Sequence, residues 1–206
     1  MKKLKQILLL MSCLFCLCAC GDKSADTKAE APTPTQFDPN QKIYAIIEVQ
    51  DYGTIKAQLR PDCAPITVDN FVKLAESGFY DGLTFHRIMS GFMIQGGDPE
   101  GTGKGGSGNP ITGEFAANGI SNPLSHMRGT LSMGRRAYDY NSASSQFFIV
   151  HADHSDLDGN YASFGTVIEG IEVVDAICEK VIPIDDNGTV LAEDQPVITK
   201  ITIERE

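Results

Sequence analysis

The stretch FHRIMSGFMIQGGD, residues 85–98, carries the strongest indication of fold in this chain. It covers nearly all of two short runs of strand-forming residues, 84–87 and 92–95, which are rich in apolar and aromatic side chains. Alternation along a strand places neighbours on opposite faces, so His86 and Arg87 are expected to point in opposite directions. An arginine among apolar residues needs a partner or a function, because an unpaired buried charge is costly. Arg87 is therefore a candidate functional residue, and His86 is interpreted as structural.

Similar strand-like runs lie on both sides of this stretch. Residues 42–49 and 53–59 flank Asp51-Tyr52-Gly53, a segment that suits a hairpin turn. Asn187-Gly188 is a second strong turn signal. The remaining strand-like runs are 130–133, 146–150, 163–167 and 197–203.

Only two segments show helical periodicity. The first has Thr67 as its expected cap, an apolar stripe that includes Phe71, and an end at Gly78. The second follows Gly170, with apolar positions at Ile171, Val174, Ala176, Ile177 and Cys178. Many short strands, 20 glycines and two helices predict a mostly β barrel or sandwich.

The first 20 residues are interpreted as a targeting segment. Three lysines precede an apolar run of 13 residues, 7–19, whereas a spanning helix needs about 20 such residues. The run ends in Leu17-Cys18-Ala19-Cys20-Gly21, which resembles the lipobox of bacterial lipoproteins. The resemblance implies a signal peptide at 1–19 and lipid on Cys20, so that the protein is exported and anchored to the extracytoplasmic face of the membrane. A thiolate metal site and an uncut single-helix anchor are the alternatives.

Charge and composition exclude one class of function and separate a tether from a folded domain. The whole sequence has 17 basic and 27 acidic residues, a net charge of −10, and loss of 1–19 removes three lysines and no acid. This acidic balance argues against nucleic-acid binding, which requires a basic face. Residues 20–40 are small, polar and proline-containing, typical of a flexible tether. From 41 to 206 no linker, repeat or charge block interrupts the sequence, which predicts one folded domain.

Three blocks follow one another along the chain: Phe85-His86-Arg87-Ile88, then residues 91–98, then Ser145-Gln146-Phe147-Phe148-Ile149. In this order they resemble the signatures of the cyclophilins. The resemblance covers nearly all of 41–206. It implies a closed eight-stranded antiparallel β-barrel capped by two α-helices, and peptidyl-prolyl cis-trans isomerase activity without metal or organic cofactor. It also implies proline-containing segments of folding proteins as partners, and we expect a monomer.

The resemblance further implies a role for each site residue. Arg87 matches the catalytic arginine, which would stabilise the twisted amide of an X-Pro bond through hydrogen bonding. The other matching positions form the proline pocket, its polar neighbours and the adjoining groove; these substrate-binding residues are Phe92, Met93, Gln95, Gly134, Gln146, Phe148, Leu157 and Tyr161.

Each of these assignments has a simpler alternative. The phenylalanines could be barrel core, the commoner fate of aromatic residues in strands, and the two glutamines could be surface residues. Phe147 and Phe148 are adjacent and face opposite ways, so only one can serve the pocket, and the family match favours Phe148. At the level of the whole protein, a module that binds proline segments without turnover is the alternative to an enzyme.

The chain departs from the family pattern at three positions. Arg135 stands where many relatives have asparagine, which could alter the groove. Asp156 stands where vertebrate-type members have tryptophan, and Tyr161 where they have histidine. Loss of the indole removes contact surface and a donor, so we predict weak inhibition by cyclosporin.

Several other patterns are interpreted as structural. Residues 101–106 satisfy G-x-G-x-x-G, but Ser107-Gly108-Asn109-Pro110 cannot open the helix that a dinucleotide site requires. The acids and histidines of 151–158 could suggest a metal site, but they lack calcium-loop spacing, and the acids are interpreted as solvated loop residues. Cys63 and Cys178 are expected at opposite ends of the barrel, too far apart for a disulfide.

Overall fold

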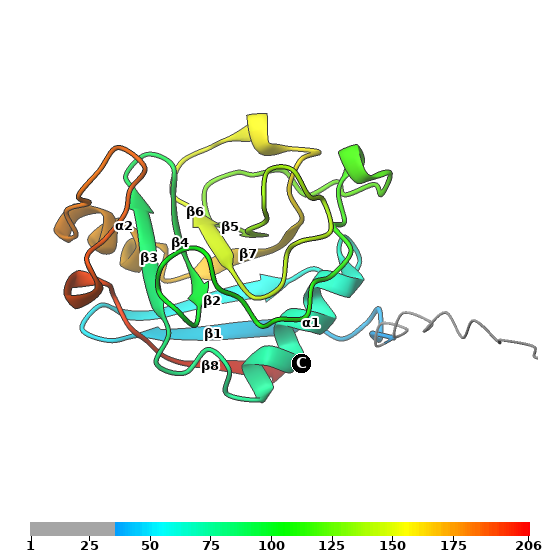
Figure 1. Cartoon of the computed structure of the whole chain (residues 1–206). Coiled ribbons are helices and arrows are strands. Elements are labelled where there is room, and N and C mark those ends of the chain that lie inside the picture. Colours follow the sequence, from blue (N-terminus) through cyan, green and yellow to red (C-terminus); the bar gives the residue numbers. More distant parts are fainter. Residues whose placement is uncertain (1–35) are drawn as a thin grey trace, which may run out of the picture. The chain divides into compact units, whose positions relative to one another are not determined.

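The computed structural model describes residues 36–206, which contain eight β-strands and two α-helices (Figure 1). The predicted signal peptide, Cys20 and the tether up to residue 35 lie outside the described residues. The strands are β1 (Ile43–Val49), β2 (Gly53–Leu59), β3 (Thr84–Met89), β4 (Met93–Asp98), β5 (Thr130–Met133), β6 (Phe147–Val150), β7 (Ser163–Glu169) and β8 (Ile198–Arg205). The helices are α1 (Pro65–Glu76) and α2 (Ile171–Lys180).

All strand pairs are antiparallel, in the order β3-β4-β6-β5-β7-β2-β1-β8. The hairpin predicted at residues 51–53 is present, with Val49 opposite Gly53. Four predicted site residues lie in β3, β4 and β6, which are neighbours in the sheet; they are Arg87, Met93, Gln95 and Phe148. The mostly β prediction is therefore confirmed, with strands close to the expected runs.

The predicted closed barrel is wrong, because no continuous ladder joins β3 to β8. Contact between these edges is limited to the isolated bridge between Thr84 and Val197 and the main-chain bonds that flank it, from residues 82–85 to residues 196–198. Farther along β3, the outer edge is occupied by the segment 188–190, whose main chain bonds to Ile88 and His86. Pro196, beside the bridge, has no N–H to extend the pairing. The sheet is an open half-barrel whose far edge is covered by a loop.

Helix α1 begins earlier than predicted and is capped from a distance. Pro65 occupies its first turn, and Ala64, at the N-cap, has no side-chain bond. The predicted cap, Thr67, lies inside the helix. The carboxylate of Glu114 instead accepts bonds from the amides of Ile66 (3.0 Å) and Thr67 (2.8 Å), and from the Thr67 hydroxyl. A buried carboxylate distant in sequence thus satisfies the free amides of this helix end.

The strands enclose a large aromatic core. Phe71 of α1 is fully buried, and its ring centroid lies 5.1–5.4 Å from those of Tyr80, Phe147 and Phe164. Helix α1 packs beside β8, whereas α2 lies near β2 and β3 at the opposite side of the sheet (Figure 1). Phe37, within the predicted tether, is partly buried against this core.

Candidate active site

A small cavity of about 120 Å³ is lined by residues of β3, β4 and β6 and of the segments next to them. Eight of the nine predicted site residues of the domain line it, and Gln146 lies immediately beside it. The lining residues are Arg87, Phe92, Met93, Gln95, Gly134, Arg135, Phe148, Leu157 and Tyr161. The fold therefore brings together residues from positions 87 to 161 of the sequence.

Arg87 lies half-buried at the polar side of this cavity. Its Nε donates to the main-chain oxygen of Asn187 (2.6 Å), and its Nη1 donates to Oε1 of Gln95 (3.2 Å). Among residues 36–206, the Nη2 atom has only a sulfur contact, 3.1 Å from Sδ of Met89. The guanidinium carbon lies 5.7 Å from the ring centroid of Phe92. Burial lowers the pKa of Arg87 from its ordinary value, yet an arginine remains charged in proteins.

Two glutamines continue the polar side of the site. Nε2 of Gln95 donates to Oε1 of Gln146 (2.8 Å), whose own Nε2 donates to the main-chain oxygen of Gly105 (2.8 Å). The chain of bonds from Arg87 to Gly105 gives both amide groups a defined orientation. Gly134 lies against this pair, because a Cβ there would be 3.2 Å from Nε2 of Gln95. A larger residue would press on the glutamines.

The glycine-rich loop 101–106 ends this chain of bonds and is organised by a single carboxylate. Buried Asp98 accepts bonds from the amides of Glu100, Thr102, Gly103 and Gly105, at 2.6–3.2 Å. Burial alone would raise the pKa of Asp98, but these four bonds together hold it below its ordinary value. The loop therefore wraps around a protein carboxylate, and the segment that follows it is not helical.

The opposite side of the cavity is apolar. Met93, Phe148 and Val150 form a small buried cluster that is separate from the main core, and Phe92, Leu157 and Tyr161 pack against it. The Tyr161 ring meets Phe148 edge to face, with centroids 5.9 Å apart. The walls form a pocket for a compact apolar group, and a charged donor lies next to it.

Sequence analysis did not identify the residue behind this apolar wall. His126 is fully buried, and its ring stacks on Phe148 with an interplanar angle of 17°. Nδ1 lies 2.7 Å from Oδ1 of Asp158, and Nε2 lies 2.9 Å from Oγ of Ser132. Burial lowers the pKa of His126, while Asp158 acts to raise it. The neutral ring therefore donates through Nδ1 to the carboxylate and accepts the Ser132 hydroxyl at Nε2.

Two histidines of the segment 151–158 support Phe92 from outside. The amide of Gly91 donates to Nδ1 of His151 (2.8 Å), and His151 Nε2 lies 3.1 Å from a carboxylate oxygen of Asp175. The His154 ring packs on Phe92 with centroids 4.6 Å apart. These two histidines are thus specific supports of the loop that carries Phe92. Their support of Phe92 gives no local sequence signal, because residues 91 and 92 are about 60 positions away along the chain.

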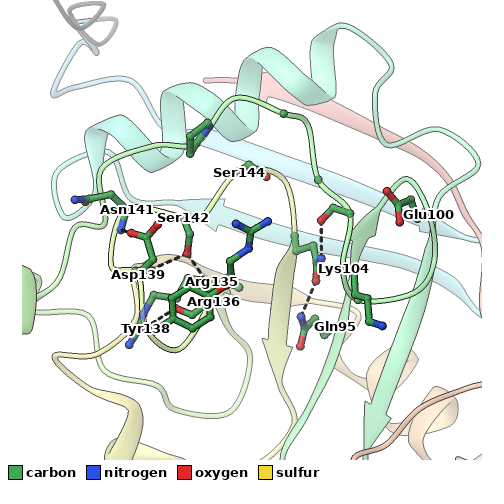
Figure 2. Close-up of a pocket in the computed structure, with 17 residues that line it drawn as sticks. Gln95, Glu100, Lys104, Arg135, Arg136, Tyr138, Asp139, Asn141, Ser142 and Ser144 are labelled. Carbon is green, nitrogen blue, oxygen red and sulfur yellow. Dashed lines mark hydrogen bonds between the residues drawn. The ribbon is translucent and has the colours of Figure 1, made fainter.

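A larger groove of about 970 Å³ adjoins the cavity and shares Gln95, Gly134 and Arg135 with it. Figure 2 shows side chains from the glycine-rich loop on one side and from the segment 134–144 on the other. The groove is mostly polar, whereas the small cavity has one polar side and one apolar side. An extended peptide could place one compact apolar residue in the cavity and its neighbours along the groove.

The remaining features singled out from the sequence do not line the cavity. Asp156, which stands where vertebrate-type members have tryptophan, is largely exposed and pairs with His154. Cys63 and Cys178 are free thiols. Among residues 36–206, no three His, Cys, Asp or Glu side chains are grouped to hold a metal ion, and no helix there is long and apolar enough to cross a membrane.

A charged donor beside a pocket for a compact apolar ring is the arrangement expected of a site for proline peptides. Residues 44–205 match the family profile "Cyclophilin type peptidyl-prolyl cis-trans isomerase/CLD". The chain therefore belongs to the cyclophilin-type peptidyl-prolyl cis-trans isomerases, and it is an enzyme of that class.

Individual relatives agree with the family match. The chain is 48% identical to peptidyl-prolyl cis-trans isomerase B of Bacillus subtilis over 124 residues, which is 60% of this chain and 82% of the relative. It is 50% identical to a peptidyl-prolyl cis-trans isomerase of Synechococcus elongatus over 59% of this chain and 77% of the relative. A cyclophilin-type isomerase from Cryptosporidium parvum, solved in the presence of the dipeptide Ala-Pro, superposes with a TM-score of 0.68 at 34% identity. That comparison covers 78% of this chain and 98% of the solved one.

Proposed function

We propose that Arg87 accelerates X-Pro isomerisation by stabilising the twisted amide while the proline ring occupies the small cavity. Rotation about an amide costs about 18–20 kcal/mol because it removes C–N resonance. In the twisted state the nitrogen lone pair is localised and can accept a hydrogen bond, which the planar ground state cannot do. A donor aimed at that nitrogen therefore binds the transition state selectively.

The bonding of the Arg87 guanidinium carries this proposal. A guanidinium has five N–H donors, and here the oxygen partners within residues 36–206 are the Asn187 carbonyl and Gln95. In the described part of the chain, the donors of Nη2 have only the Met89 sulfur, a weak acceptor, so they are available to a substrate. Because Nε and Nη1 are held by hydrogen bonds, Nη2 has a fixed position at the cavity. The enzyme would thus supply a preorganised donor without proton transfer.

The glutamines have a separate role in this proposal. Gln95 holds Nη1 of Arg87, and Gln146 holds Gln95, so the pair keeps the guanidinium in place. Gln146 also lines the larger groove, where its amide would face the substrate backbone. Phe92, Met93, Phe148, Leu157 and Tyr161 would enclose the proline ring.

The test replaces Arg87 with alanine and follows isomerisation of an Ala-Pro peptide by NMR exchange. Removing one preorganised donor typically lowers the rate by about 10²–10³-fold, and we expect a loss of that order in kcat/KM. Arg87→Lys keeps the charge but not the planar fork, so it should recover only part of the activity. Arg60→Ala, which removes an equal charge from an exposed pair with Asp62, serves as the matched control.

Two outcomes would contradict the mechanism. If Arg87→Ala kept the wild-type rate while folding normally, Arg87 would have no catalytic role. If the wild-type protein bound the peptide without accelerating exchange, the site would act as a proline-binding module.

We further propose that the enzyme is exported, lipid-anchored through Cys20, monomeric, and active on proline-containing segments of proteins that fold outside the cytoplasm. Export and anchoring are supported by the sequence of residues 1–21, in which three lysines precede an apolar run with a lipobox-like end. Cys20→Ala should abolish labelling by a radioactive or clickable fatty acid and release the protein from the membrane fraction. Unchanged labelling would exclude Cys20 as the anchor.

A further inference from the structure

The side chain of Arg135 lies at the boundary of the cavity and the larger groove and lines both. Its guanidinium carbon lies close to three aromatic rings, at 4.6 Å from the centroid of Tyr161, 4.9 Å from Tyr140 and 5.2 Å from Phe115. A planar cation can stack on several ring faces at once, and such contacts strengthen where water is excluded. One arginine thus joins three aromatic side chains that are distant in sequence.

The same guanidinium also makes three hydrogen bonds to main-chain oxygens. Nε donates to Asn160 (2.9 Å), and Nη1 donates to Arg136 (3.0 Å) and Ala137 (3.1 Å). The bonds connect the segment after β5 to the segment that carries Tyr161. In Figure 2, Arg135 and its neighbours Arg136 and Tyr138 gather at this side of the groove. The side chain is therefore committed to protein partners and is not an extended surface arginine.

Tyr161 depends on ring contacts for its position. Within residues 36–206, its ring meets Phe148 and, more distantly, His126 on one side, and Arg135 on another. No hydrogen bond of its hydroxyl to a described residue accompanies these contacts. Without Arg135, the tyrosine would be held by the apolar cluster alone.

We propose that Arg135 is a positioning residue, which holds Tyr161 as a fixed wall of the proline cavity and joins the 134–137 segment to it. This inference rests on the proposed function of the cavity. Arg135 acts on the substrate through Tyr161, so its loss weakens binding of the proline ring in ground and transition states alike. The effect belongs in KM and leaves kcat nearly unchanged.

A double-mutant cycle tests the proposal on the intact domain. Arg135→Gln is expected to raise KM for an Ala-Pro peptide by about fivefold, with kcat within about twofold of wild type. Tyr161→Leu should raise KM by a comparable or larger factor. Adding Arg135→Gln to Tyr161→Leu should then change KM little, because the wall that Arg135 supports is already gone.

Two further variants separate charge from geometry. Arg135→Lys keeps the positive charge but cannot stack or make the forked bonds, so it should resemble Arg135→Gln. Arg60→Gln removes an equal charge from the exposed Asp62 pair and should leave KM unchanged. The aromatic resonances of Tyr161 should shift in Arg135→Gln and remain in place in Arg60→Gln.

Several results would overturn the proposal. Independent effects that multiply in the double mutant would mean that Arg135 contacts the peptide directly, and full rescue by lysine would mean that charge alone matters. An unchanged KM in Arg135→Gln would remove the role altogether. If Arg135→Gln does not fold by circular dichroism, the cycle is run with Arg135→Lys. If the wild type proves inactive, peptide dissociation constants from NMR titration replace KM. Failure of the proposed function is then distinguished from failure of the positioning role of Arg135.

Discussion

Phe147 and Phe148 are neighbours in β6, yet they belong to different parts of the molecule. Phe147 is fully buried in the main core, where its ring meets Phe71, Tyr80 and Phe85. Phe148 points to the other face, into the small cluster beside the cavity, and is backed by His126. The period of two along a strand produces this division. One face of β6 stabilises the fold and the other presents a wall of the site.

The two buried histidines differ in their hydrogen bonding. His86 lies in β3 close to Gly103 of the glycine-rich loop, and neither ring nitrogen has a hydrogen-bond partner among residues 36–206. His126, behind the cavity, has both nitrogens bonded, to Asp158 and Ser132. A paired polar group fixes the geometry of its surroundings, whereas an unpaired one only costs free energy. Polar support is thus concentrated where the apolar wall must remain open to a ligand.

The largest expected effect separates the two phenylalanines. Phe147→Ala should lower the free energy of unfolding by about 3–5 kcal/mol, because it creates a cavity among packed rings. Phe148→Ala should cost less stability, since its cluster is small and borders a cavity, but should sharply raise KM for an Ala-Pro peptide. Urea denaturation and the exchange assay measure the two effects. Equal losses of stability would show that the core and the cavity wall are not energetically distinct.

A smaller effect separates the two histidines. His126→Leu should lower the free energy of unfolding by about 1–3 kcal/mol, because buried Ser132 loses its partner. His86→Leu replaces an unpaired group with one of similar size and should be neutral or stabilising by about 1 kcal/mol. Urea midpoints of the two matched variants are the measurement. A strongly destabilised His86→Leu protein would show that His86 has a partner that maintains the fold.

The smallest effect is a pH dependence shared by both histidines. Burial lowers the pKa of each below 6.5, so the unfolded chain binds protons more readily than the native protein. The contribution of the two neutral histidines to the free energy of unfolding is therefore fully present above about pH 7. It is lost as the pH decreases through 6.5, by up to about 1.4 kcal/mol per histidine at pH 5.5. His86→Leu and His126→Leu should each flatten this profile between pH 7.5 and 5.5. A slope unchanged in both variants would assign the dependence to other groups.

Much of the fold could be predicted because strand and helix patterns are local. The apolar runs around Phe85, Met93 and Phe147 indicated strands, and Gly170 correctly marked the start of α2. The predictions that failed concern contacts between distant segments. Glu114 caps α1 in place of Thr67, and the segment 188–190 occupies the edge of β3 that a closed barrel would pair with β8. Neither partner can be identified from local periodicity.

The candidate site likewise has residues that the sequence predicted and residues that it did not. The motifs placed Arg87, Gln95, Phe148 and Tyr161 among its residues, and the structure brings these four together. The supporting side chains, His126, His151 and His154, were missed because each acts on a residue far away in sequence. Arg135 was recognised only as a departure from the family pattern, and its three aromatic neighbours emerge only after folding.

The sequence alone determined that the domain is mostly β, which side chains alternate between its faces, and which motif residues form the candidate site. These properties depend on residue type and on spacing along a few neighbours. The tertiary structure decided that the sheet stays open, that Glu114 caps α1, and that the cavity walls rest on His126 and Arg135. Hydrogen bonds and ring contacts need defined distances between distant segments, and only packing of the whole domain supplies those distances.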